Sequence, residues 1–153
     1  MRRASDSIIQ FIQAEGNEGF RARPYNDGGG VMTIGHGHVI RKHEKLPVPM
    51  TRAQADLLMR NDLAPVEIYL SAIDTNLPVP LTGNQFDGLC SLVFNIGLDQ
   101  FEDSTLLKKL RRGDMAGAAS QFNCWIYDNK KKIAGLVTRR AAERAIFESK
   151  DDG

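Results

Sequence analysis

Cysteines and long apolar runs are scarce in this chain, and each scarcity excludes a class of protein. Cys90 and Cys124 are the only cysteines among 153 residues, too few and too far apart for a secreted disulfide scaffold or a thiolate zinc site. Both thiols are expected to be reduced and buried. No apolar run approaches the roughly 18 residues that a membrane-spanning helix needs, so we expect no stable insertion into a membrane.

An excess of charge of one sign is also lacking. Twenty Lys and Arg residues stand against nineteen Asp and Glu residues, for a net charge of +1, while 42% hydrophobic and 25% charged residues are ordinary globular proportions. The total therefore gives no indication of a polyanion-binding protein. The distribution is uneven, however, because residues 1–107 carry nine basic and thirteen acidic side chains, whereas residues 108–153 carry eleven and six.

Glycine is concentrated in one segment. Half of the 14 glycines fall within residues 16–37, where the turn-forming run from Pro24 to Gly28 precedes a β-like stretch from Val31 to Ile40. A small hairpin or three-stranded sheet is predicted there.

Helical patterns surround this segment. A first helix is predicted from Asp6 or Ser7 to about residue 14. Two later helices should begin at capping boxes, Thr51-x-x-Gln54 and Thr82-x-x-Gln85. Pro65 either kinks the first of these or starts a second segment, because proline removes a backbone donor.

These patterns predict an α+β, mainly α fold in a single domain over residues 1–153. The expected parts are a small β lobe at about 16–45, a connector helix at about 51–74 and a larger helical lobe at about 82–149. Clefts between unequal lobes are common ligand sites, so an inter-lobe cleft is expected beside the β lobe.

Two carboxylates in the glycine-rich segment are the candidate catalytic groups. Glu18 follows the end of the first predicted helix, whereas Asp27 lies in a turn with backbone amides nearby. Different surroundings for two carboxyl groups suit a general acid and a second, charged carboxylate. A glycosidase needs this pair and, if it inverts, room for a water, although a Glu and an Asp nine residues apart are more often solvated surface residues.

Thr33 adds a hydroxyl group to this set. On a strand, Thr33, Gly35 and Gly37 would share one face. A bulky ligand could approach the backbone at the two glycines, and the hydroxyl could hold a water close to Asp27.

The order Glu18, Asp27, Thr33 and then Ile34-Gly35-x-Gly37-His38 closely resembles the phage-type lysozymes, the endolysins of glycoside hydrolase family 24. The likeness is strongest to the soluble endolysins of lambdoid phages and covers nearly the whole chain. It extends through Thr51-Arg52-Ala53-Gln54-Ala55, Asn84-Gln85-Phe86-Asp87-Gly88-Leu89, Phe94-Asn95-Ile96-Gly97, Ser104-Thr105-Leu106-Leu107 and Gly135-Leu136-Val137-Thr138-Arg139-Arg140.

The resemblance implies a lysozyme-like fold and hydrolysis of the β-1,4 linkage from N-acetylmuramic acid to N-acetylglucosamine in peptidoglycan. It implies that Glu18 is the general acid, Asp27 the second carboxylate and Thr33 a residue that positions the attacking water. No cofactor and no metal is expected. The alternative is a peptidoglycan-binding module that has lost catalysis, and a nucleic-acid-binding helical protein is a more distant third.

The histidines allow two interpretations. His36, His38 and His43, with Glu44, could be drawn as a metal site, but no second cluster of ligands at fixed spacing supports it. The resemblance instead gives His38 a structural role, with an ion pair to Asp62.

The basic residues near the C-terminus also allow several interpretations. Lys130, Lys131 and Lys132, with Arg139 and Arg140, could form a solvated face, in which Arg139 pairs with Glu143, or a surface attracted to an anionic cell wall. Both are favoured over nucleic-acid binding, because no recognised nucleic-acid motif accompanies the lysines.

The expected partner is therefore the glycan strand of peptidoglycan, bound by a monomer. Because no export signal is seen, the protein should remain in the host cytoplasm until the membrane is permeabilised and then act on the cell wall from the periplasm. Family analogy implies that it depends on a holin for this step.

Overall fold

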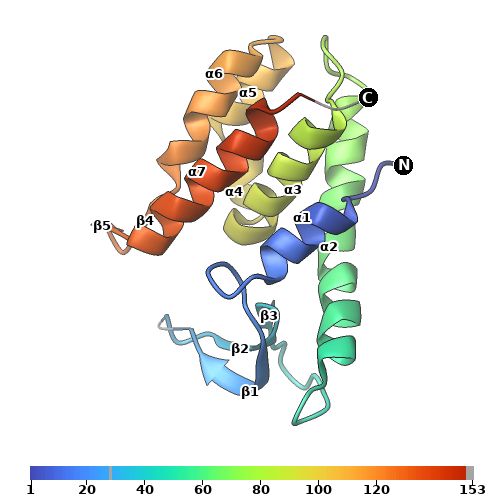
Figure 1. Cartoon of the computed structure of the whole chain (residues 1–153), viewed down its shortest axis with the longest axis vertical. Helices are drawn as coiled ribbons and strands as arrows, with labels where there is room; N and C mark the ends of the chain where they lie inside the picture. The colour runs from blue at the N-terminus through green and yellow to red at the C-terminus, as the bar shows by residue number, and fades with distance from the viewer. Residues whose placement is uncertain (28, 151–153) are drawn as a thin grey trace. The chain divides into compact units, whose positions relative to one another are not determined.

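The computed structural model describes residues 1–27 and 29–150 and divides into two compact units. The first unit comprises Met1–Ile8 and Val66–Gly153, and the second comprises Ile9–Pro65. Figure 1 shows that helices predominate and that the three-stranded sheet is small. The fold is thus α+β and mainly α, as the sequence predicts.

The first helix, α1 (Asp6–Gln13), forms where its apolar periodicity predicts. Ile8, Ile9 and Ile12 are its buried side chains. Its cap differs from the prediction, because the hydroxyl of Ser5 accepts a hydrogen bond from the amide of Ile8 at 3.2 Å. Ser5 therefore supplies the oxygen that satisfies an otherwise unpaired amide of the first turn.

A three-stranded antiparallel sheet follows, in the order β1 (Arg21–Asn26), β2 (Met32–Gly35) and β3 (His38–Val39). The β-like stretch is thus two strands, because a turn with positive φ at Gly35 and Gly37 interrupts it. Ile34 packs with Met50 and Ala55 in a small apolar core of the second unit. The partly buried side chains around this core are Phe20, Ile40, Leu46 and Leu58.

The connector is one continuous helix, α2 (Arg52–Asp74), which contains Pro65. Its predicted capping box is present, since the Thr51 hydroxyl accepts from the Gln54 amide at 3.1 Å and the Gln54 side chain accepts from the Thr51 amide at 2.9 Å. The boundary between the two units falls directly after Pro65.

The first unit contains the remaining helices. They are α3 (Gly83–Ile96), α4 (Leu98–Glu102), α5 (Thr105–Arg111), α6 (Met115–Ser120), a 3-10 turn (Gln121–Cys124) and α7 (Ala134–Glu148). Figure 1 shows α3 and α7 side by side. Gly88 permits this approach, since a Cβ there would lie 3.1 Å from the Glu143 carbonyl oxygen and from the Phe147 Cβ.

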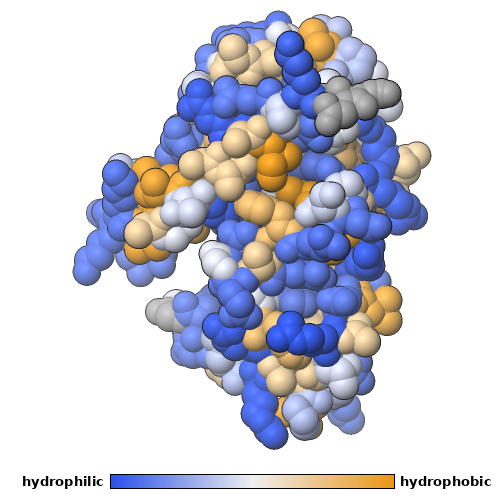
Figure 2. All heavy atoms as spheres, in the orientation of Figure 1, coloured by the Kyte–Doolittle hydropathy of each residue, from blue (hydrophilic) through white to orange (hydrophobic). Residues whose placement is uncertain are grey.

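A short hairpin, β4 (Tyr127–Asp128) and β5 (Lys131–Lys132), precedes α7 and was not predicted. Its turn residues, Asn129 and Lys130, both have positive φ. All three lysines of the run are exposed. Figure 2 shows apolar side chains beside hydrophilic ones at this end of the unit, where Ile133 is exposed.

Cys90 is buried as predicted, but Cys124 is exposed, because it ends the 3-10 turn rather than facing the core. Among residues 1–27 and 29–150, no helix is both long and apolar enough to cross a bilayer.

Candidate functional site

Glu18 lies in the turn that follows α1. Its amide donates to the carbonyl of Ile12 at 3.0 Å, and the amide of Gly19 donates to the carbonyl of Ala14 at 3.0 Å. These bonds satisfy carbonyls that the end of a helix leaves unpaired. Glu18 is partly buried, and its carboxylate lies directly against Gly37, where a Cβ would clash with Oε2.

Asp27 lies in the loop between β1 and β2. Its Oδ1 accepts hydrogen bonds from the amides of Gly29 at 2.9 Å and Val31 at 3.3 Å, and its own amide donates to the Val31 carbonyl at 3.1 Å. The residue is exposed. The backbone of the loop thus orients the carboxylate while leaving it open to a solvent-borne molecule.

Tyr25 lies on β1, between Glu18 and Asp27 in the sequence. In the β1–β2 register Tyr25 lies opposite Thr33. Burial raises the pKa of Tyr25, the negative charges of Glu18 and Asp27 raise it further, and the charge of Arg21 opposes them. The charges of both carboxylates thus act on the Tyr25 phenol. Glu18, Asp27 and Thr33 all belong to the second unit.

Thr33 itself is only 4% exposed, and its hydroxyl donates to the Val31 carbonyl at 3.3 Å. The predicted common face of Thr33, Gly35 and Gly37 is wrong, because β2 ends at Gly35. A Cβ at Gly35 would lie 3.1 Å from the Met50 sulfur, so that glycine faces the small apolar core. Gly37 instead makes room for Glu18.

The arrangement can support acid–base chemistry at an exposed surface. One carboxylate belongs to a partly buried residue and lies against a glycine, the other is exposed and held by amides, and a hydroxyl lies across the strand pair from Tyr25. Sequence reasoning missed Tyr25, which it treated only as part of a turn. The signal that could have identified it is its position in the sequence between the two carboxylates.

His38 forms the predicted ion pair with Asp62, with 2.7 Å between Nδ1 and Oδ2. The structure adds a second carboxylate, Glu44, whose Oε1 lies 2.9 Å from Nε2. Burial alone would lower the pKa of His38, but the hydrogen bonds with Glu44 and Asp62 outweigh it, so the pKa is raised. The Arg41 amide and then His38 hold the pKa of Glu44 below its usual value.

The interpretation of the histidines as a metal site gains no support from the geometry. The nitrogens of His38 face carboxylates, and those of His36 face the Gly19 carbonyl and Asp56. No group of three or more His, Cys, Asp or Glu side chains that could hold a metal ion occurs in the described part of the chain.

The basic C-terminal residues separate into two environments. Arg139 is 4% exposed and Arg140 is fully buried, so the prediction that both lie on a basic surface is wrong. The Arg139–Glu143 pair is present at 3.1 Å but is buried. Arg140 donates to Asn95 Oδ1 at 2.6 Å, so Asn95 accepts from α7. A buried charge needs such partners.

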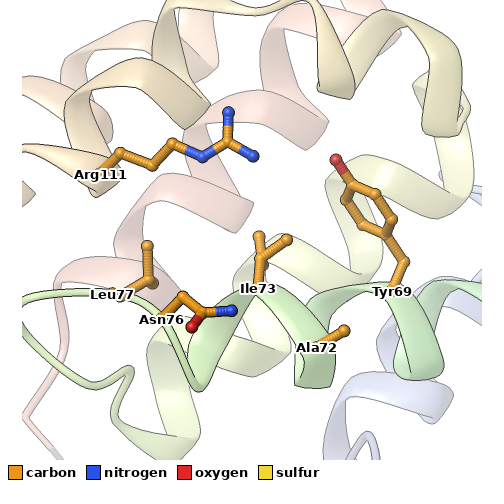
Figure 3. Close-up of a pocket in the computed structure, with 6 residues that line it drawn as sticks. All are labelled: Tyr69, Ala72, Ile73, Asn76, Leu77 and Arg111. Carbon is orange, nitrogen blue, oxygen red and sulfur yellow. The ribbon is translucent and has the colours of Figure 1, made fainter.

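A separate hollow lies in the first unit between α2 and α5 (Figure 3). Its volume is about 260 Å³, and it is lined by Tyr69, Ala72, Ile73, Asn76, Leu77 and Arg111. None of the sequence-predicted site residues lines it. The Tyr69 hydroxyl is buried and has no hydrogen-bond partner among the described residues.

Comparisons with known proteins place this geometry in a family. The family model described as Phage lysozyme matches residues 15–143. An endolysin of Acyrthosiphon pisum secondary endosymbiont phage 1 is 42% identical over 136 residues, which cover 86% of this chain and 90% of that protein. A SAR-endolysin of Enterobacteria phage P21 is 38% identical over 133 residues, covering 86% and 78%.

The solved structures agree with the sequence relatives. The crystal structure of a point mutant of P22 lysozyme matches with a TM-score of 0.78 at 36% identity, covering 97% of this chain and 100% of the other. The match therefore extends over both compact units and includes the segment from Glu18 to Thr33. The chain belongs to the phage lysozyme family.

Proposed function

We propose that Glu18, Asp27 and Thr33 carry the reaction of this peptidoglycan-hydrolysing endolysin. The bond cleaved is the β-1,4 linkage between N-acetylmuramic acid and N-acetylglucosamine. The observation that carries the proposal is the different surroundings of two carboxylates in one short segment. The Glu18 carboxylate lies against Gly37 in a partly buried residue, whereas Asp27 is exposed and accepts hydrogen bonds from two backbone amides.

Glu18 acts as the general acid. The residue is partly buried with its carboxyl group against Gly37, and the turn that carries it is hydrogen-bonded to α1. A carboxyl group held by such a turn suits proton donation to the leaving glycosidic oxygen. Asp27, exposed and hydrogen-bonded by two amides, acts as the second, charged carboxylate.

Thr33 helps to position the attacking water. Its hydroxyl hydrogen is donated to the Val31 carbonyl, which leaves lone pairs on Oγ1 that can accept a hydrogen bond from water. A water held there, close to Asp27, can be deprotonated as it attacks the sugar. We therefore propose a direct, inverting displacement.

Replacing Glu18 tests this assignment. We expect Glu18→Gln to reduce hydrolysis of purified peptidoglycan by about 10²- to 10⁴-fold, because an amide cannot supply the proton that general acid catalysis contributes. Asp27→Asn should also be severely impaired, and Thr33→Ala should lose activity to a smaller extent. The measurement is the rate of release of reducing ends, with circular dichroism to show that each variant is folded.

Glu15→Gln is the matched control. Glu15 is exposed, three residues before Glu18, and its carboxylate pairs with Arg21 at 3.4 Å. Its loss removes the same charge from the same turn but should leave the rate unchanged. A Glu18→Gln variant as active as this control would refute the assignment of the general acid.

We further propose that the enzyme works as a monomer and reaches its substrate from the host cytoplasm after a holin has permeabilised the membrane. All three residues assigned to the reaction come from one chain, within residues 18–33, so no second copy is needed to complete the site. Peptidoglycan lies outside the inner membrane, so a protein made in the cytoplasm needs that membrane opened. The binding-module alternative is not favoured, because the chain is 42% identical to an endolysin and the phage lysozyme family model matches over the segment that holds the site.

A further inference from the structure

The turn that carries Glu18 is held from two directions. On one side, the amides of Glu18 and Gly19 donate to carbonyls at the end of α1, at 3.0 Å each. On the other side, the carbonyl of Gly19 accepts a hydrogen bond from Nδ1 of His36. The residue after the candidate acid is therefore hydrogen-bonded to the turn that follows β2.

The ring of His36 is itself fixed by its neighbours. Its Nε2 lies 3.2 Å from Asp56 Oδ1 on α2, and the same oxygen accepts from Gln13 Nε2 at 2.7 Å. The Phe20 ring contacts the imidazole, with 5.7 Å between ring centroids. Both ring nitrogens thus face oxygen atoms that can only accept hydrogen bonds.

Gly37, next to His36 in the chain, lies against the Glu18 carboxylate. It lies so close to Glu18 that a Cβ at Gly37 would clash with Oε2. The pair of His36 and Gly37 thus contacts the turn at two places, the Gly19 carbonyl through the imidazole and the Glu18 carboxylate at Gly37. A displacement of His36 would move both supports together.

We propose that His36 is a positioning residue that holds Glu18 in its working geometry through the hydrogen bond to the Gly19 carbonyl. Asp56 and Gln13 orient the imidazole for this bond. His36 is 4% exposed and both of its ring nitrogens are engaged, so it does not touch the substrate. The inference rests on the assignment of Glu18 as the general acid.

Two isosteric variants separate the two hydrogen bonds of the ring. The side-chain amide nitrogen of asparagine occupies nearly the place of Nδ1, whereas that of glutamine occupies nearly the place of Nε2. His36→Asn can therefore keep the bond to the Gly19 carbonyl, and His36→Gln keeps only the bond to Asp56. Both variants lose the ring that packs against Phe20, so they share most of any purely structural cost.

The experiment measures kcat and KM on soluble, uncross-linked glycan strands, with rates corrected for the folded fraction. We expect His36→Gln to lower kcat by about 10- to 100-fold, since small misplacements of a catalytic group have effects of this size. His36→Asn should retain kcat within a few-fold of the wild type. KM should change less than two-fold in both variants, because the glycan-binding surface is untouched.

Two further variants keep the result interpretable. His43→Gln changes an exposed histidine elsewhere in the second unit and should match the wild type. Asp56→Asn removes the charged acceptor of Nε2 while preserving side-chain shape. If His36→Gln does not fold, Asp56→Asn should still lower kcat by about three- to ten-fold without a change in KM, an intermediate effect of a misoriented ring.

Several outcomes would overturn the positioning role. They are wild-type kcat in folded His36→Gln, equal losses of kcat in the Asn and Gln variants, or, if His36→Gln is unfolded, wild-type kcat in Asp56→Asn. Glu18→Gln is assayed in parallel to separate the two proposals. If it is active, the assignment of the acid fails; if it is inactive while His36→Gln is fully active, only the role of His36 fails.

Discussion

His38 is a buried histidine whose two ring nitrogens both face carboxylates. Asp62 lies on α2, and Glu44 lies in the loop between β3 and α2. One ring therefore joins a strand, a loop and a helix of the second unit. Because the charged form of the ring is the one that both carboxylates stabilise, the stability of this unit depends on the protonation of His38.

The sign of this pH dependence follows from the raised pKa of His38. A histidine whose pKa is higher in the folded than in the unfolded state contributes stability below its unfolded pKa, and that contribution is lost as the pH rises through the folded value. We expect His38→Gln to destabilise the protein more at pH 6 than at pH 9. Each unit of pKa elevation corresponds to about 1.4 kcal/mol, measured as the difference in free energy of urea unfolding between the two proteins.

The exposed His43 provides the comparison for His38. His43→Gln should give the same small difference from the wild type at both pH values. A His38→Gln effect that is constant with pH, or that grows toward alkaline pH, would contradict an imidazolium clamped by two carboxylates.

At the residue scale, the sequence predicts one contact of the second unit correctly. The His38–Asp62 pair that the resemblance implies is present, whereas the roles of Glu18, Asp27 and Thr33 stay predictions from motif order. The position of Tyr25 opposite Thr33 could not be predicted, because it depends on a β1–β2 pairing whose register shifts between Arg21 and Tyr25. An irregular register of this kind has no signature in residue alternation.

At the element scale, α3 is the helix whose start is most clearly encoded. Thr82 accepts from the Gln85 amide, and the Gln85 side chain accepts from the Thr82 amide, which completes a capping box. Most of the helix beyond this box is buried, including Phe86 and Leu89. The cap therefore sets the first residue of a core element.

Removing this cap should cost stability without affecting the chemistry. We expect Thr82→Ala to lower the free energy of unfolding by about 1 kcal/mol, the usual cost of an N-cap oxygen, while Thr82→Ser should remain close to the wild type. Thermal and urea unfolding measure the difference. Equal stability of the Ala and Ser variants would show that the hydroxyl contributes nothing to α3.

The elements that were missed are those whose determinants are not local. The β4–β5 hairpin has Asn129 and Lys130 at its positive-φ turn positions, where glycine would have been the recognisable signal. The burial of Arg139 and Arg140 depends on α3 residues more than forty positions earlier, Ser91 and Asn95. The spacing of basic residues along α7 could not reveal those partners.

At the scale of the whole molecule, the distribution of charged residues says more about possible binding surfaces than the net charge of +1 does. Two of the eleven basic residues in the last third of the chain, Arg139 and Arg140, are buried. The exposed positive charge of that third therefore includes the lysines of the β4–β5 hairpin but not the α7 arginine pair. Any electrostatic attraction to an anionic wall would act through exposed groups of this kind.

Expression without a permeabilising partner tests the route to the wall. We expect Gram-negative cells that make this protein alone to remain turbid, and to lyse within minutes once the inner membrane is opened chemically. The reason is that the substrate is on the far side of that membrane. Cells that make Glu18→Gln should stay turbid after the same treatment, and lysis by the wild type without membrane damage would disprove holin dependence.

The two cysteines differ in accessibility, so their reaction with a thiol reagent can report local unfolding of the protein. Burial raises the pKa of the Cys90 thiol well above its usual range, whereas Cys124 is exposed at the end of the 3-10 turn. A thiol reagent can therefore reach only the Cys124 thiol in the native protein, and it can reach the Cys90 thiol only when α3 leaves the core. Labelling stoichiometry can thus count opening events in a chain that carries no engineered probe.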